Sequence, residues 1–166
     1  MATPDLKANG LYVLLFIRTH PPVPDDFHWA LYIHRDSKTG GTKYHIRQPG
    51  SSAWLADHGP VAAVMKSFLL VGLFQIADIP AGLEEHVDRT MKSFDARLND
   101  IPTTCRVWMF WVLELLQRPE NRQTVLRCES LERLEREIKD WGNSNAMSAA
   151  GNEQPRPVAA SLLCGL

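Results

Sequence analysis

The stretch Phe27-His28-Trp29-Ala30-Leu31-Tyr32-Ile33 decides the fold of this chain. It is rich in aromatic and β-branched residues and is bounded by a proline-rich loop, which predicts a strand. A second run, Thr42–Arg47, predicts the next strand. The intervening letters HRDSKTGG contain paired glycines, typical of a hairpin turn. We therefore expect an antiparallel hairpin.

This hairpin carries two histidines on one face. Alternate residues of a strand point to opposite faces. If Ala30 pairs with His45, His28 and His45 share a face and lie one diagonal step apart. The residues that alternate with the two histidines along the strands are apolar and would face the core. We expect the remaining histidines to lie on the surface: His20, His34, His58 and His86.

Other apolar runs complete an α+β pattern. Leu11–Ile17 is continuously apolar, which predicts a strand buried on both faces, and Leu69–Ile76 predicts another. Helices are expected from Ala81, from Thr104 to Gln117, and over Ser130–Trp141. The second of these is apolar on every side, so it should be central and buried. The sequence thus predicts an antiparallel sheet packed against helices.

The domain organisation follows from where these patterns stop. We expect a single domain over 8–141 and a flexible C-terminal tail over 142–166, because the chain beyond Gly142 is rich in small and polar residues. Gln48–Pro60 is polar and broken by glycine and proline, so it is expected to be irregular.

Composition limits the partners and the compartment. The 166 residues carry a net charge of −1, which does not favour nucleic acid or an anionic membrane as a partner. The longest apolar runs are far shorter than the roughly 20 residues of a membrane-spanning helix. Three cysteines, an odd number, favour a reduced compartment. We expect a cytoplasmic protein without a secretory signal that acts on a small-molecule, acyl or peptide-like substrate.

Cys105 is the candidate nucleophile. Thr103 or Thr104 is a suitable N-cap, so Cys105 falls in the first helical turn, where unpaired N–H groups and the helix dipole stabilise a thiolate. With His28 as base and His45 as the group that orients it, the parts of a thiol catalytic site are present. Taken alone, Cys105 is more typical of a buried core residue than of a nucleophile, and the two histidines shift that balance. A zinc site lacks a fourth ligand, so we expect no metal and no cofactor.

These residues resemble the lecithin:retinol acyltransferase-like family. The resemblance lies in His28-Trp29-Ala30-Leu31-Tyr32-Ile33, in His45-Ile46-Arg47-Gln48-Pro49, and in Thr104-Cys105 at the start of a helix. It implies a circularly permuted papain-like fold of the NlpC/P60 type, with Cys105 as nucleophile, His28 as base and His45 as the third member. The chain is also similar to small uncharacterised fungal proteins of like length.

Three functions remain open at this point. The first is a thiol enzyme, a hydrolase or acyltransferase, that acts on an ester, thioester or amide through an acyl-cysteine at Cys105. The second is a biosynthetic cyclase or isomerase that uses His28 and Cys105 for proton transfer. The third is a catalytically inactive interaction module.

Overall fold

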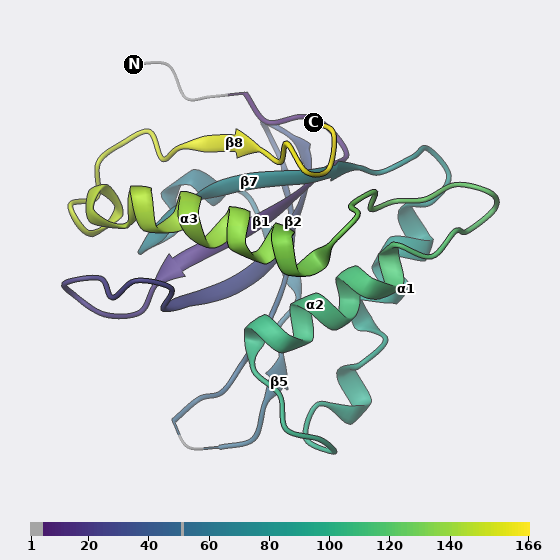
Figure 1. Cartoon of the computed structure of the whole chain (residues 1–166), viewed down its shortest axis with the longest axis horizontal. Coiled ribbons are helices and arrows are strands. Elements are labelled where there is room, and N and C mark those ends of the chain that lie inside the picture. The colour runs from purple at the N-terminus through teal and green to yellow at the C-terminus, as the bar shows by residue number, and fades with distance from the viewer. Residues whose placement is uncertain (1–4, 51) are drawn as a thin grey trace.

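The computed structural model describes residues 5–50 and 52–166. These residues form an α+β arrangement of a sheet and helices (Figure 1). The strands are β1 (Gly10–Ile17), β2 (Phe27–Asp36), β3 (Gly40–Tyr44), β4 (Ile46–Arg47), β5 (Leu55–Ala56), β6 (Gly59–Val61), β7 (Leu70–Asp78) and β8 (Val158–Ala160). The helices are α1 (Glu84–Lys92), α2 (Cys105–Leu116) and α3 (Leu131–Ala150), with short 3-10 helices η1 (Val64–Lys66) and η2 (Asp95–Arg97).

The main sheet has six strands in the order β6-β3-β2-β1-β7-β8. All its pairs are antiparallel except β7 with β8, which is parallel, so the sheet is mixed. β4 and β5 form a separate two-stranded ladder. In the central hairpin Leu31 lies opposite Tyr44, and the glycine pair belongs to β3 rather than to the turn. The α+β expectation is confirmed at this level.

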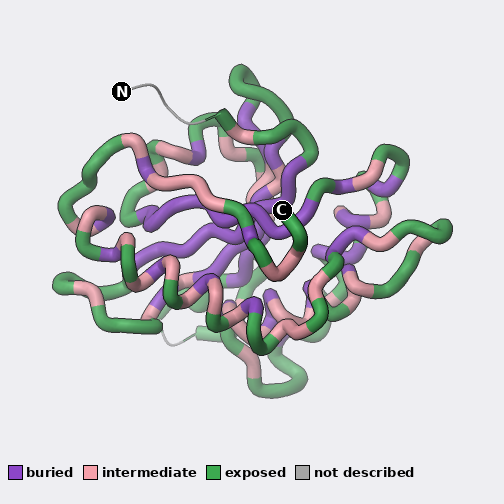
Figure 2. Tube along the Cα trace, turned by 45° about the horizontal axis from the view of Figure 1, so that its top comes forward, coloured by how far each residue is buried: buried purple, intermediate pink, exposed green. Residues whose placement is uncertain are grey.

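The main core lies between the sheet and the three α-helices. α3 crosses β7 and β1, α2 packs on β2, and α1 packs on α2 (Figure 1). β1 is buried along its whole length, as its continuous apolar run predicts. The odd-numbered residues of β2, Phe27, Trp29 and Leu31, enter this core together with the buried face of α2. Burial is concentrated at the centre of the strands (Figure 2).

A smaller core covers the opposite face of the sheet. It contains Tyr12, Leu14 and Phe16 of β1 and Ala30 and Tyr32 of β2. Val64 of η1 and Leu70 close it. This face is the one that carries the even-numbered residues of β2, and therefore His28.

The chain beyond residue 141 differs from the expected flexible tail. α3 does not end at Gly142 but continues to Ala150. A Cβ at Gly142 would lie 2.6 Å from Leu15 Cδ1 and 3.0 Å from Phe27 Cζ, so glycine there allows α3 to approach the sheet closely. In the sequence a glycine at this position suggests the end of a helix. In the structure Gly142 is a packing contact within α3.

The segment after α3 is also ordered against the sheet. Arg156 is 2% exposed, and its guanidinium donates to the carbonyls of Leu70 and Val71 and to Ser148 Oγ. β8 then pairs with β7. The composition of this segment suggested disorder because it offers little apolar area to bury. The segment is instead held by the hydrogen bonds of one buried cation, Arg156.

Short strands also appear inside the segment expected to be irregular. β5 pairs with β4 and β6 pairs with β3, on either side of Asp57 and His58. That expectation is therefore wrong in part. Strands of two or three residues are too short to give a periodic pattern.

Candidate functional site

The β2–β3 pairing brings His28 and His45 together. Leu31 lies opposite Tyr44, the last residue of β3, and His45 follows directly after it. His28 Nε2 lies 2.8 Å from His45 Nδ1, and the two rings meet edge to face with centroids 5.1 Å apart. The two imidazoles are hydrogen-bonded to each other.

Asp57 lies behind His45. Its Oδ2 is 3.4 Å from His45 Nε2 and accepts a 2.9 Å hydrogen bond from Arg47 Nε. The main-chain N–H of Asp57 also donates to the His45 carbonyl over 2.9 Å. The β4–β5 ladder, in which Arg47 lies opposite Leu55, brings this aspartate back to the histidine. The sequence analysis did not single out Asp57.

This order of contacts fixes the tautomers. The Asp57 carboxylate can only accept, so His45 carries its proton on Nε2 and accepts on Nδ1. His28 must then donate from Nε2, which leaves the lone pair on its Nδ1. Within residues 5–50 and 52–166, that nitrogen has no hydrogen-bond partner, and His28 itself is only partly buried. The site therefore ends in one available basic nitrogen.

Burial and nearby cations keep both imidazoles neutral. Burial, together with the nearby charges of Lys43 and Arg18, lowers the pKa of His28 to about 4. Burial, Lys43 and His28 lower the pKa of His45 to about 3, against the opposing effect of Asp57. Lys43 lies over the Phe16 ring, 5.1 Å from its centroid. At neutral pH the site thus holds an uncharged histidine pair beside positive charge.

Cys105 occupies the predicted helix position but lies elsewhere in the fold. It is the first residue of α2, and the Thr104 hydroxyl caps the helix by accepting from the Val107 N–H over 3.2 Å. Cys105 is 4% exposed and belongs to the core on the helix side of the sheet. In the described part of the chain its sulfur makes no hydrogen bond to His28 or His45. His28 instead packs against Phe16, which belongs to the smaller core on the opposite face of the sheet.

His58 is a buried histidine that the sequence analysis placed on the surface. Its side chain is 7% exposed and stacks on Trp108 of α2, with ring centroids 5.9 Å apart. Its Nδ1 accepts from the His45 main-chain N–H over 3.2 Å, so Nε2 carries the proton and donates to Asp95 over 3.0 Å. Both ring nitrogens are therefore committed. The adjacent Asp57-His58 pair in a turn-rich segment was the one sequence signal that could have drawn attention to it.

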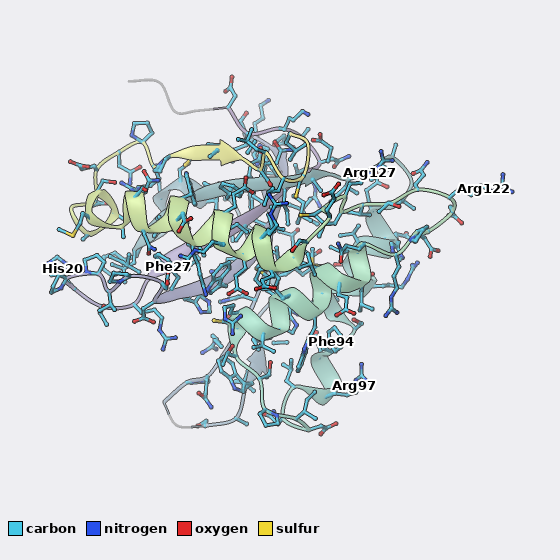
Figure 3. The ribbon with its side chains drawn as sticks, in the orientation of Figure 1. His20, Phe27, Phe94, Arg97, Arg122 and Arg127 are labelled. Atoms are coloured by element: carbon cyan, nitrogen blue, oxygen red, sulfur yellow. The ribbon has the colours of Figure 1, made fainter. Side chains whose placement is uncertain are left out.

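The other histidines divide between surface and interior. His20 lies exposed in the β1–β2 loop, at the outer edge of the molecule, as expected (Figure 3). His34 is 7% exposed and His86 has its Nε2 buried without a partner, so the surface expectation is wrong for both.

Within the described residues, no group of three or more His, Cys, Asp and Glu side chains is arranged to hold a metal ion. None of the helices in that part of the chain combines the length and apolarity needed to cross a bilayer.

Comparison with known proteins gives a family. A family model described as "Family of unknown function (DUF6914)" matches residues 8–147. The chain belongs to this family. No curated protein and no solved structure matches it. The range matched by the DUF6914 model contains His28, His45, Asp57 and Cys105 and ends within α3, before Arg156 and β8.

Proposed function

We propose that the protein is an enzyme that moves a proton on a small carbonyl compound, with His28 as the general base. The observation that carries this proposal is the chain of contacts from Asp57 through His45 to His28, which ends in an unpartnered Nδ1. A base of this kind must be unprotonated, oriented and reachable by substrate. The low pKa of His28 supports the first condition, and the bond to His45 supports the second.

The proposed step is proton abstraction next to the carbonyl. The C–H electron pair moves into the substrate as an enolate while the proton goes to His28 Nδ1. The imidazolium that forms on His28 donates from Nε2 to His45 Nδ1, and the Asp57 carboxylate stabilises its positive charge through His45 without itself taking a proton. Return of a proton to a different carbon gives an isomer of the substrate. No other reactant is consumed.

The charges beside His28 support an anionic intermediate. Lys43 and Arg18 are close enough to disfavour a positive charge on His28, and the same field stabilises a negative charge that develops on a bound substrate. Lys43 is partly buried against Phe16, where its charge is screened less than on an open surface. The enolate oxygen would face this ammonium group.

Thiol acyl transfer is the second proposal. Its support is the resemblance described above together with the order of elements: a strand bearing His28, a residue His45 after the next strand, and Cys105 at the capped start of a helix that packs on β2. On this proposal the fold is a circularly permuted papain-like one. The thiol and the imidazole would have to reach the same side of the sheet, so the geometry supports proton transfer better. An inactive interaction module is the third possibility.

We further propose a small-molecule substrate and a cytoplasmic location. The support is a net charge of −1 and three free thiols, none of which forms a disulfide in the described residues.

Deuterium exchange tests the proposed function. The protein is incubated in D₂O with a panel of 2-oxo and 3-oxo carboxylic acids, and loss of the C–H signal next to the carbonyl is followed by proton NMR. We expect exchange that is abolished in His28→Ala, weakened in His45→Gln and retained in Cys105→Ser.

The mass of the intact protein after exposure to thioesters and activated esters tests the competing thiol mechanism. An acyl adduct on Cys105, with turnover lost in Cys105→Ser, would establish the thiol mechanism in place of ours. Absence of exchange with every member of the panel, or equal exchange in His28→Ala, would also overturn the proposal.

A further inference from the structure

A cavity lies at the other end of β2, away from the histidine pair. Its volume is about 520 Å³, and Tyr32, His34, Val64 and Met65 are among the residues that line it. His34 is six positions beyond His28 on the same face of the strand, which separates the two by roughly 20 Å. The cavity is thus independent of the proposed catalytic function.

A buried tyrosine–histidine pair forms one wall. Tyr32 is fully buried and His34 is 7% exposed, with Tyr32 Oη 2.9 Å from His34 Nδ1. Burial raises the pKa of Tyr32 to about 12, so the phenol keeps its proton. Among the described residues the phenol has no other acceptor, so its O–H donates to His34 Nδ1. His34 is then protonated on Nε2, which has no partner in the described part of the chain.

A glycine holds Tyr32 in place. Gly41 of β3 lies against the Tyr32 ring, and a Cβ there would lie 2.8 Å from Cζ and 2.9 Å from Cε2. Any larger residue would push the ring, and with it the hydroxyl that orients His34. Of the paired glycines, Gly41 therefore serves this contact, whereas Gly40 has a positive φ and lies against the main chain of Val61 and Ala62.

The remaining walls combine apolar surface with two cations. Leu6, Val64 and Met65 pack against the smaller core and supply the apolar part. Arg35 and Lys66 line the cavity, and neither forms an ion pair within the described residues.

Two carboxylates also lie at this cavity. Asp36 is occupied by hydrogen bonds from the Lys38 N–H, the Thr39 N–H and the Thr39 hydroxyl. Asp5 is exposed at the rim. The cavity thus offers the Nε2–H donor of the buried His34 and, among its exposed lining residues, the two cations Arg35 and Lys66.

We infer that this cavity binds a small monocarboxylate with an apolar body. The carboxylate accepts a hydrogen bond from His34 Nε2 and is neutralised by Arg35 and Lys66. The apolar body lies against Val64 and Met65. A volume of this size is in the range of small-molecule sites, and the combination of apolar walls with a few convergent polar groups is typical of them.

Calorimetric titration of the full chain with octanoate tests this inference, with octan-1-ol as the uncharged match. We expect octanoate to bind more tightly than octanol. His34→Ala should weaken octanoate binding about tenfold, since a charge-assisted hydrogen bond is lost. His20→Ala, which removes an exposed histidine of a distant loop (Figure 3), should leave it unchanged.

Two further measurements keep the inference testable if His34→Ala does not fold. Lys66→Ala should weaken octanoate but not octanol. Long-range ¹H–¹⁵N correlation of the imidazoles should show His34 protonated on Nε2, and octanoate should shift that resonance. Equal binding of the two compounds, no saturable binding of octanoate, wild-type affinity in Lys66→Ala, or a proton on His34 Nδ1 would each overturn the inference.

Discussion

The main-chain N–H of His45 donates to Nδ1 of His58 over 3.2 Å, while the side chain of His45 contacts His28 on the other side of the sheet. His45 thus joins two buried histidine systems, one on each face. The contact from His58 fixes the backbone at the point where β3 gives way to β4. His58 is therefore a positioning residue for the His28–His45 pair, although its imidazole contacts only the main chain of His45.

His58→Ala should destabilise the fold by about 2–3 kcal/mol. The change leaves the His45 N–H without its acceptor, removes the partner of Asp95 and vacates the stack on Trp108. Urea unfolding measures the effect. His20→Ala, at an exposed loop position, is the control and should change the free energy of unfolding by less than about 0.5 kcal/mol. Equal stability of the two variants would contradict the role assigned to His58.

Stability should fall as the solution is acidified below about pH 6.5. The folded-state pKa values of His28 and His45 are lowered to about 4 and about 3, so the unfolded chain binds more protons than the native one in this range. Their neutral, buried state is fully favourable above the unfolded pKa and costs progressively more as pH falls toward the folded values. Urea unfolding at several pH values measures the slope, which should be shallower in His28→Gln. Parallel profiles for the two proteins would contradict the burial of a neutral His28.

Cys105 should react with iodoacetamide more slowly than Cys128 in the folded protein. Cys105 is 4% exposed within the main core, whereas Cys128 is partly exposed. The sequence favoured faster labelling of Cys105, since its place at a helix start stabilises a thiolate. Cys164 should also be slow, because burial raises its pKa to about 12. Peptide mapping after brief labelling measures the order. Fastest labelling at Cys105 would favour the thiol mechanism.

Arg156→Ala should cost about 2–4 kcal/mol in free energy of unfolding, because several buried carbonyls lose their donor at once. Thermal unfolding provides the measurement. Arg127→Ala is the matched control, since Arg127 is exposed and projects from the loop between α2 and α3 (Figure 3). A similar melting temperature for both variants would show that the segment after α3 contributes little.

The central elements could be predicted because apolar periodicity determines them. β1 is apolar at every position and proves buried throughout, and α2 begins at the cap expected from Thr104. That His28 and His45 share a face needed only the alternation of residues along two strands. In each case a pattern local to the sequence carries the information.

The missed features depend on contacts between distant residues. Gly142 and Gly41 are close-approach positions, and nothing in their own segments says which side chain lies against them. His58 is buried against Trp108 of α2, far from it in the sequence, and one histidine in a polar segment looks like any other. The side of the sheet on which Cys105 lies relative to His28 is likewise set by how α2 packs on β2, which no strand periodicity reveals.

The parallel pairing of β8 with β7 has a consequence for biosynthesis. Chains emerge from the ribosome in order at roughly 5–20 residues per second, and β8 is made after β7 and all three α-helices. Until it arrives, the part of β7 that pairs with β8, Leu73–Gln75, is an unprotected margin with free N–H and C=O groups. A nascent or prematurely terminated chain therefore presents a template for pairing with another copy. β8 closes that margin only when synthesis has passed residue 160, which makes the polar segment after α3 a safeguard against aggregation.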